Sequence, residues 1–345
     1  MSPHPGGPES PEGPSPALVF DMLFAYQRSA ALRAAIELDL FRVVGEGPGD
    51  AASIAKACGS SPRGVRILCD FLTVNGLLVK RDGRYTNSET AALFLDSRSP
   101  ASVAKTAGFL GHPVVQEPFN HLGQIVRSGS TVLPGQGSVE PENPAWVEFA
   151  HRMAPMMGPM AGPLGGIALR GLEGPISVLD VAAGHGLFGI ELARQNRAAR
   201  VVAVDWAAVL EVARANAAKA GVESRWEGRA GSAFEVEFGG PHDVVLLTNF
   251  LHHFDVATCV ELLKKVRAAL RPGGRVAALE FVPDEDRVSP PMPASFALTM
   301  LATTQAGDAY TLRELGDMYR AAGFTAVEGH PVPTGPHTVV VGTAG

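Results

Sequence analysis

The sequence has few cysteines, and none of them are closely spaced. Cys58, Cys69 and Cys259 are odd in number and form no Cys-x-x-Cys pair. Because disulfide frameworks and structural zinc sites need paired cysteines, this pattern predicts a reducing compartment and no structural metal. The first residues also lack a basic segment followed by an apolar one, so we expect no secretion signal and a cytoplasmic protein.

Long apolar runs and an excess of basic residues are missing as well. No run of about 18 apolar residues occurs, so we expect no membrane span. The 29 Lys and Arg residues are outnumbered by 35 Asp and Glu residues, which gives a formal net charge of −6. This charge disfavours a nucleic-acid partner, because nucleic-acid-binding proteins usually present a basic face. With 345 residues, of which 46% are hydrophobic, the chain can build a large core and two domains.

The N-terminal third combines a polar tail with a compact helical pattern. Residues 1–15 are rich in Pro, Gly and Ser, which predicts a disordered tail. Two helices are predicted at 17–44, and their apolar surface exceeds what a small domain needs, which suggests a partner subunit. At 49–86, a short helix, a second helix opened by Ser61-Pro62 and a hairpin around Asp82-Gly83 predict a winged helix-turn-helix.

In a regulator, the second helix of this motif would recognise DNA. Its basic residues are only Arg63 and Arg66, and Asp70 offsets them. We therefore favour packing or dimerisation over DNA binding for this part of the chain.

Residues 89–166 are predicted to be helical, with a loop rich in Gly, Pro and Ser at 128–143. Pro155, Pro159 and Pro163 follow at four-residue spacing. Since proline lacks the N–H that continues an α-helix, we expect the helix to break or kink here.

Methionines are concentrated in the same stretch, and their flexible thioethers either fill a core or line a substrate pocket. A second apolar pair lies four residues apart on one face of a predicted helix at 296–304, a pattern that a core helix also shows. The candidate substrate contacts are Met153, Met156, Met157, Phe296 and Met300.

The most informative stretch is 176–205. An apolar run meets Gly184-His185-Gly186, a helical period starts at Leu187, and a second apolar run ends at Asp205. The glycines allow the backbone to approach a ligand closely, and the helix start offers unpaired N–H groups to it. An acid at the tip of the next strand can accept hydrogen bonds from two ribose hydroxyls. The pattern predicts a nucleoside cofactor, and both NAD and S-adenosylmethionine fit it.

Strands and helices continue to alternate after Asp205, which predicts an α/β fold with a mostly parallel sheet and helices on both faces. The last apolar strand, 338–342, has no crossover helix and must lie antiparallel to its neighbour. An NAD domain does not normally close its sheet in a hairpin, so S-adenosylmethionine is favoured.

With these elements in place, the sequence resembles the class I S-adenosylmethionine-dependent methyltransferases of the two-domain, small-molecule O-methyltransferase type. The motifs that carry the resemblance are Val178-Leu179-Asp180-Val181-Ala182-Ala183-Gly184-His185-Gly186, Asp205, Gly231-Ser232-Ala233-Phe234, Phe250-Leu251-His252-His253-Phe254 and Leu270-Arg271-Pro272-Gly273-Gly274-Arg275.

The resemblance implies a seven-stranded Rossmann-like sheet with an antiparallel last strand, preceded by a mainly helical winged-helix domain. It implies a helical arm and dimerisation domain at 16–100, a helical linker at 101–170 that contributes to the substrate pocket, and a catalytic domain at 171–345. It also implies a homodimer formed through the N-terminal helices.

Carried over by position, the resemblance also implies the site residues. Its cofactor contacts would be the glycine loop for the methionine moiety, Asp205 for the ribose and the residues that flank the adenine, while Thr248 and Asn249 would lie near the sulfonium or the substrate. The candidate cofactor residues are Asp180, Gly184, Gly186, Asp205, Trp206, Ser232, Ala233, Phe234, Thr248 and Asn249. His252 matches the general base, Glu280 matches the acid that orients it, and His253 is a second candidate base.

Two positions depart from the family pattern. Ser232 stands where an acid usually follows the glycine of the adenine loop, and Ala309 stands where a second acid usually flanks the base, with Asp308 one residue away. These departures leave C- or N-methylation, or a non-methylating reaction with S-adenosylmethionine, as alternatives to O-methylation.

Methyl transfer requires the nucleophile and the methyl carbon to be brought into line, and imidazole can take a proton near neutral pH. The pair of histidines could also be a metal site or a polar loop, but no Cys, Asp or Glu lies nearby at ligand spacing, so we expect no metal. We therefore predict methyl transfer from S-adenosylmethionine to a hydroxyl of an apolar or aromatic small molecule. A DNA-binding regulator and an NAD-dependent dehydrogenase are the more distant alternatives.

Overall fold

The computed structural model describes residues 14–47 and 49–345, so most of the predicted disordered tail lies outside the described residues. The chain forms two compact units, which meet in sequence between Ala107 and Gly108. The predicted domain boundaries at 100 and 170 stay predictions. Among the described residues, none of the helices combines the length and the apolar character needed to cross a membrane.

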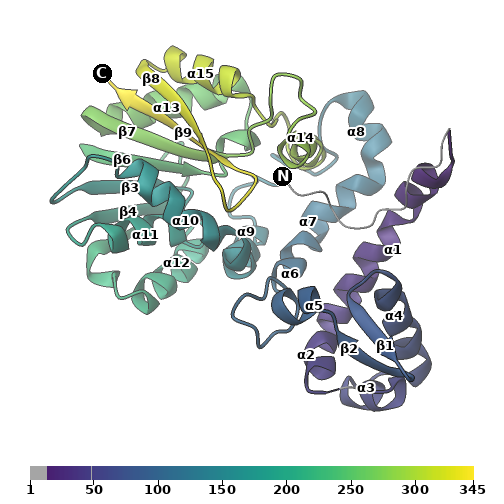
Figure 1. The fold of residues 1–345 in the computed structure, drawn as a ribbon. Helices are drawn as coiled ribbons and strands as arrows, with labels where there is room; N and C mark the ends of the chain where they lie inside the picture. Colours follow the sequence, from purple (N-terminus) through teal and green to yellow (C-terminus); the bar gives the residue numbers. More distant parts are fainter. Residues whose placement is uncertain (1–13, 48) are drawn as a thin grey trace. The chain divides into compact units, whose positions relative to one another are not determined.

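The first unit is the predicted winged helix. Its core comes from the C-terminal part of α1 and from the elements that follow. The Ser61 side chain accepts from the Gly64 N–H and so caps α4, while Asp82 and Gly83 turn the hairpin with positive φ angles of 49° and 76°. The elements are α1 (Ala17–Glu37), α2 (Leu40–Gly45), α3 (Ala51–Ala57), α4 (Pro62–Val74), β1 (Leu78–Arg81), β2 (Arg84–Asn87) and α5 (Glu89–Phe94) (Figure 1).

Helices lead from this unit to the sheet of the second unit. The predicted loop at 128–143 is confirmed as the segment between α8 and α9. The helices are α6 (Thr106–Leu110), α7 (Pro113–Gln116), η1 (Glu117–His121), α8 (Leu122–Ser128), α9 (Ala145–Arg152) and α10 (Ala154–Ala168).

The prediction of a broken helix at the prolines is only partly right. The break falls at Met153, between α9 and α10, and α10 then continues through Pro159 and Pro163. The residue before each of these prolines is a glycine, Gly158 or Gly162. A glycine has no Cβ to clash with the proline ring, so it can keep the helical conformation that other residues lose before proline.

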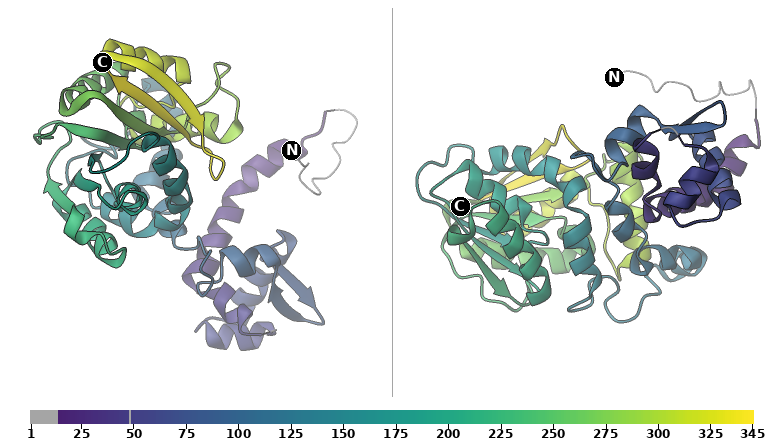
Figure 2. Two further views of the ribbon diagram at one scale, coloured as in Figure 1. Left: turned by 60° about the vertical axis from the view of Figure 1, so that its left-hand side comes forward. Right: turned by 90° about the horizontal axis from the view of Figure 1, so that it is seen from below.

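A seven-stranded sheet in the order β5-β4-β3-β6-β7-β9-β8 is the centre of the second unit (Figure 2). β9 pairs antiparallel with both β7 and β8, while the other pairs are parallel, as predicted. The strands are β3 (Ser177–Val181), β4 (Arg200–Asp205), β5 (Trp226–Ala230), β6 (His242–Thr248), β7 (Leu270–Glu280), β8 (Phe324–Pro331) and β9 (Thr338–Ala344).

Helices cover both faces of this sheet, so alternate strand residues enter two different cores. Val178 and Val244 pack with residues of α10, α11 and α12, whereas Leu179 and Val245 pack with residues of α13 and α15. The helices on the sheet after α10 are α11 (Leu187–Gln195), α12 (Ala207–Lys219), α13 (Val256–Ala269) and α15 (Leu312–Ala321), while α14 (Pro291–Thr303) packs on α7, η1 and α8. Because both faces are buried, the central strands appear in the sequence as nearly continuous apolar runs.

One predicted boundary is wrong. The helix expected from Phe296 begins at Pro291, because proline is well suited to the first turn of a helix. A 3₁₀ turn, η2 (Glu223–Arg225), precedes β5. Asp255 caps α13 by accepting from the Thr258 N–H, and Thr311 caps α15 in a capping box with Glu314.

Candidate active site

A cavity of about 1070 Å³ opens at the carboxyl ends of the parallel strands in the second unit. One set of lining residues follows strands β3 to β6, and a second set comes from α9, α10 and α14 and from the loop at 128–143. The first set includes Ala182, Gly184, Asp205, Trp206, Ser232, Ala233, Phe234, Thr248 and Asn249, and the second includes Met153, Met156, Met157, Phe296 and Met300.

The glycine loop after β3 turns sharply and presents its backbone to the cavity. Ala182, Gly184 and Gly186 all have positive φ angles, of 54°, 56° and 74°. A Cβ added at Gly184 would meet only the Phe149 ring, at 3.5 Å, so this backbone is open to a ligand. Gly186 does not line the cavity: a Cβ there would come within 2.9 Å of Ala213 Cβ, so this glycine permits helix packing.

Asp205 holds the loop and faces the cavity. Its carboxylate accepts hydrogen bonds from the Gly184 N–H at 2.8 Å and from the Trp206 N–H at 2.7 Å. Burial raises the pKa of this carboxyl to about 6, although the two N–H donors partly oppose the effect. Each oxygen keeps a further lone pair, so the carboxylate can still accept hydrogen bonds from a ligand.

Asp180, which precedes the loop, lies behind it and does not line the cavity. Its Oδ2 accepts from the Gly189 N–H at 3.1 Å, and burial raises the pKa of its carboxyl to about 7. A Cβ at Gly189 would lie 2.7 Å from that oxygen, so the third glycine of the loop allows strand and helix to pack closely. The adenine-loop residue Ser232 makes a local contact, accepting from the Phe234 N–H at 3.2 Å.

His252 and Glu280 form a buried pair at the ends of β6 and β7. The Nδ1 atom of His252 lies 2.5 Å from Oε2 of Glu280, and the other carboxylate oxygen accepts from the N–H groups of Phe250 and Leu251 at 3.1 and 2.9 Å. His252 lines the cavity, and its Nε2 atom has no hydrogen-bond partner within residues 14–47 and 49–345. Because the carboxylate accepts the Nδ1 proton, Nε2 carries the free lone pair.

His253 lines the cavity beside His252, with ring centroids 4.4 Å apart. Burial, together with the neighbouring His252, lowers its pKa well below the ordinary value. Its Nδ1 atom is buried without a hydrogen-bond partner in the described part of the chain, and no carboxylate orients the ring. The geometry of a base with a supporting acid is therefore found at His252.

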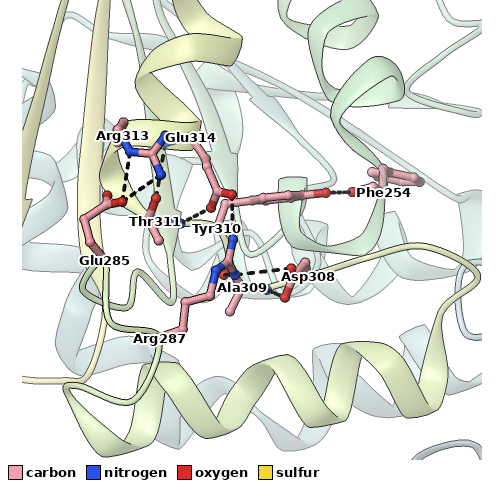
Figure 3. Close-up of polar contacts among 9 residues, drawn as sticks. All are labelled: Phe254, Glu285, Arg287, Asp308, Ala309, Tyr310, Thr311, Arg313 and Glu314. Carbon is pink, nitrogen blue, oxygen red and sulfur yellow. Dashed lines mark hydrogen bonds and ion pairs between the residues drawn. The ribbon is translucent and has the colours of Figure 1, made fainter. Parts of the chain in front are cut away.

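Asp308 does not take the place of the second acid. Its carboxylate pairs with Arg287 at 3.3 Å and is 42% exposed, while its backbone N–H donates to the His252 carbonyl at 3.0 Å. Figure 3 shows Arg287 between Asp308 and Glu314, beside the Glu285–Arg313 pair. Ala309 is fully buried, so Glu280 is the only carboxylate bonded to His252 among the described residues.

Several residues that line the cavity were not predicted from the sequence. Phe281 stacks on Phe296 with ring centroids 4.0 Å apart, and Trp146 packs edge-on against His253 at 5.4 Å. The loop at 128–143 also lines the cavity, because the Ser138 N–H donates to the Thr303 carbonyl at 2.8 Å and so attaches the loop to α14. Phe281 follows Glu280 directly and could have been found from its place at a strand end.

Among the described residues, no group of three or more His, Cys, Asp or Glu side chains is arranged so that it could bind a metal ion. The cavity instead combines a nucleoside-type loop, a buried His–carboxylate pair and an apolar wall.

Comparison with known proteins agrees with this combination. Residues 166–325 match the O-methyltransferase domain model and residues 20–97 match the O-methyltransferase dimerisation domain model. The chain is 30% identical to acetylserotonin O-methyltransferase of Mus musculus, over 95% of this chain and 88% of that protein. It is also 30% identical to 3-hydroxy-5-methyl-1-naphthoate 3-O-methyltransferase of Streptomyces sahachiroi, over 93% of each.

A solved structure extends the comparison to the fold. A candidate O-methyltransferase from Nostoc punctiforme superposes with a TM-score of 0.93 at 45% identity, covering 96% of this chain and all of that one. Together, these findings favour S-adenosylmethionine over NAD at the glycine loop and identify the winged helix as part of a dimerisation domain. The chain belongs to the S-adenosylmethionine-dependent O-methyltransferase family, with a dimerisation domain followed by a methyltransferase domain.

Proposed function

We propose that this enzyme transfers the methyl group of S-adenosylmethionine to a hydroxyl of an apolar or aromatic small molecule, with His252 as general base. The observation that carries the proposal is the 2.5 Å contact between His252 Nδ1 and Glu280 Oε2, combined with the place of His252 in the cavity wall. This arrangement directs an imidazole lone pair to the space where an acceptor would lie.

The residues around the glycine loop fit the cofactor. Gly184 leaves room for a ligand beside the backbone, the Asp205 carboxylate can accept from ribose hydroxyls, and Trp206 and Phe234 provide apolar surface for an adenine. When bound, S-adenosylmethionine supplies an electrophilic methyl group on its sulfonium. Thr248 ends β6 and Asn249 follows it, three residues before His252 in the sequence.

The role of the His252–Glu280 pair is to take a proton. As a hydroxyl attacks the methyl carbon, its proton must leave at or before the transition state, and Nε2 of His252 can accept it. Glu280 keeps the ring in the productive tautomer and stabilises the imidazolium that forms. Since the pair is buried, its carboxylate acts in a low dielectric and its effect on the ring is strong.

The acceptor side of the cavity is apolar and partly aromatic. Phe281 and Phe296 stack on one another, and Met157 and Met300 are buried in the same wall. Aromatic rings and thioethers bind flat apolar molecules without demanding particular polar groups. This lining supports an aromatic acceptor.

Mass spectrometry of products tests the proposal. The enzyme, S-adenosylmethionine and a panel of phenols such as 2-naphthol should give a product with one added methyl group, which fragmentation places on oxygen. A methyl group on carbon would favour C-methylation instead, the second candidate, which is supported by the lone carboxylate at His252 and by the buried Ala309.

Cofactor affinity should depend on pH through Asp205. Only the ionised carboxylate accepts from two hydroxyls, and burial raises the pKa of Asp205 to about 6. We therefore expect the affinity for S-adenosylhomocysteine to be constant above about pH 6.5 and to fall by up to about tenfold per pH unit below pH 6. Isothermal titration calorimetry from pH 5 to pH 8 measures this effect.

The control for this prediction is Asp205→Asn, which should bind more weakly at pH 8 and lose the pH dependence between pH 5 and pH 6. Asp180, whose pKa burial raises to about 7, is present in both proteins. A variant that keeps the full pH dependence would assign it to Asp180 and contradict the role of Asp205.

We also propose a homodimer formed through the N-terminal helices. The first half of α1 exposes a series of large apolar side chains, which is unusual for a surface that stays in water. These are Leu18, Val19, Phe20, Met22, Leu23 and Phe24, each at least 53% exposed.

We also propose a cytoplasmic location, which the free thiols of Cys58, Cys69 and Cys259 support.

Charged residues on this face should therefore dissociate the dimer. The double variant Phe20→Glu, Leu23→Glu should sediment as a monomer in analytical ultracentrifugation, whereas the unmodified protein sediments as a dimer. Val74→Glu is the matched control, because Val74 is 86% exposed at the end of α4. If the double variant still sediments as a dimer, the dimer interface does not include this part of α1.

A further inference from the structure

Asn249 occupies a constrained position between the cofactor loop and the base. It follows the end of β6 with a positive φ of 53°, and its N–H donates to the Leu279 carbonyl at 2.8 Å. Asparagine is one of the few residues other than glycine that adopt this conformation readily. Its side chain lines the cavity, three residues before His252.

A histidine from a distant turn holds the Asn249 side chain. His337 lies just before β9, is only 1% exposed and places Nε2 at 2.9 Å from Asn249 Oδ1. The same turn is fixed on α10, because the Thr334 hydroxyl donates to the Pro159 carbonyl at 3.0 Å. The His337 side chain is therefore held inside the unit, behind residues that line the cavity.

The protonation state of His337 decides which end of the Asn249 amide faces the histidine ring. Burial, with His252 nearby, lowers the pKa of His337 to about 3, so the ring is neutral and carries one N–H. Its Nδ1 atom is buried without a hydrogen-bond partner among the described residues, and a proton there would be a buried, unpaired donor. The proton therefore belongs on Nε2, which donates to Asn249 Oδ1.

The amide nitrogen of Asn249 then points away from His337. Its contact is the thioether of Met157, at 3.9 Å, and sulfur is a weak acceptor. The surrounding side chains belong to the wall that carries the base: His337 packs on Phe281 at 4.0 Å, and Phe296 packs edge-on against His252 at 4.8 Å. A nearly unsatisfied N–H donor thus lies in the cavity wall beside Met157, one of the candidate substrate contacts.

We infer that the amide N–H of Asn249 binds a second oxygen of the acceptor molecule, next to the hydroxyl that is methylated, and that His337 is its positioning residue. The inference rests on the proposed function and narrows its substrate class to aromatic molecules with neighbouring oxygens. A site built to hydrogen-bond a substrate oxygen discriminates against analogues that lack it, because its own polar group is then left unpaired.

Binding of two matched probes to the enzyme saturated with S-adenosylhomocysteine tests the inference. Isothermal titration calorimetry should show that 2,3-dihydroxynaphthalene binds about tenfold more tightly than 2-naphthol, the effect of about one hydrogen bond. This dead-end complex needs no turnover. Failure of the proposed function would appear separately, as absence of an O-methylated product with S-adenosylmethionine.

Asn249→Asp is the decisive variant. It keeps the shape of the side chain and the acceptor for His337, but it has no N–H to donate. We expect the tenfold preference to disappear, and the affinity for S-adenosylhomocysteine, measured in the same titrations, reports separately any contact of Asn249 with the cofactor. His337→Phe should lose part of the preference, His337→Gln should keep more of it, and Thr334→Val, which loosens the turn that carries His337, should lower it less than His337→Phe does.

Three results would overturn the inference. The first is an equal preference in Asn249→Asp and the unmodified protein. The second is a loss of S-adenosylhomocysteine affinity without a change in preference, which would make Asn249 a cofactor residue. The third is that neither probe binds, since the wall would then not accept a naphthalene with vicinal oxygens.

Discussion

Replacing His252 with alanine is expected to lower kcat by about 10²–10⁴-fold, the range that a positioned general base contributes. The ring is the group whose free nitrogen faces the cavity, so its loss leaves the hydroxyl to release its proton to water. KM for S-adenosylmethionine should change little, because the groups that fit the cofactor lie at the glycine loop and Asp205. Steady-state kinetics with a phenol that the enzyme methylates measure both constants.

His253→Ala provides the matched control, because the two rings are neighbours and both are buried. This variant should retain most of the activity, since no carboxylate orients His253 and burial keeps its pKa low. His252 packs on Phe296, so thermal unfolding should be followed in both variants, and His252→Asn gives a polar replacement if alanine lowers Tm. If His253→Ala loses more activity than His252→Ala, then His253 and not His252 is the general base.

Glu280→Gln should reduce kcat by a similar factor, about 10²–10⁴, without removing any atom from the cavity wall. One side-chain oxygen already accepts from the N–H groups of Phe250 and Leu251, so the amide oxygen of glutamine must take this place. Its NH₂ group then faces Nδ1 of His252 and donates to it. The ring is forced to carry its proton on Nε2, where it cannot accept one from the substrate.

Glu285→Gln is the control for this variant. Glu285, five residues after Glu280, pairs with Arg313 at 2.9 Å (Figure 3). It has no hydrogen bond to His252, whose Nδ1 atom is bonded to Glu280. Its replacement should leave kcat within about twofold, as expected for an exposed ion pair. An unchanged kcat in Glu280→Gln would mean that the tautomer of His252 is irrelevant and that the histidine is not the base.

The parts of the site that were predictable from sequence lie at the ends of consecutive parallel strands. The glycine loop follows β3, Asp205 ends β4, His252 follows β6 and Glu280 ends β7. The local pattern predicted the glycine loop and Asp205, whereas the resemblance to the family assigned His252 and Glu280. All four lie close together because the carboxyl ends of parallel strands meet at one edge of the sheet. The short range of each motif explains why it could be recognised without any tertiary contact.

The contacts that escaped prediction join segments far apart in the chain. Asn249 and His337 are separated by 88 positions. The hydrogen bond from Ser138 to Thr303 joins the irregular loop at 128–143 to α14. Nothing in the sequence near His337 indicates that its turn reaches back to β6. The prediction of a break at Pro159 and Pro163 was wrong for a different reason. The glycines that precede these prolines remove the clash that normally ends a helix there.

A crystal structure of the enzyme with S-adenosylhomocysteine and a methyl-accepting phenol would show whether His252 is the base. We expect the adenosyl group against Asp205, and the phenol oxygen about 2.6–3.2 Å from Nε2 of His252. A phenol oxygen closer to another base, or a His252 ring turned away from the ligand, would contradict it.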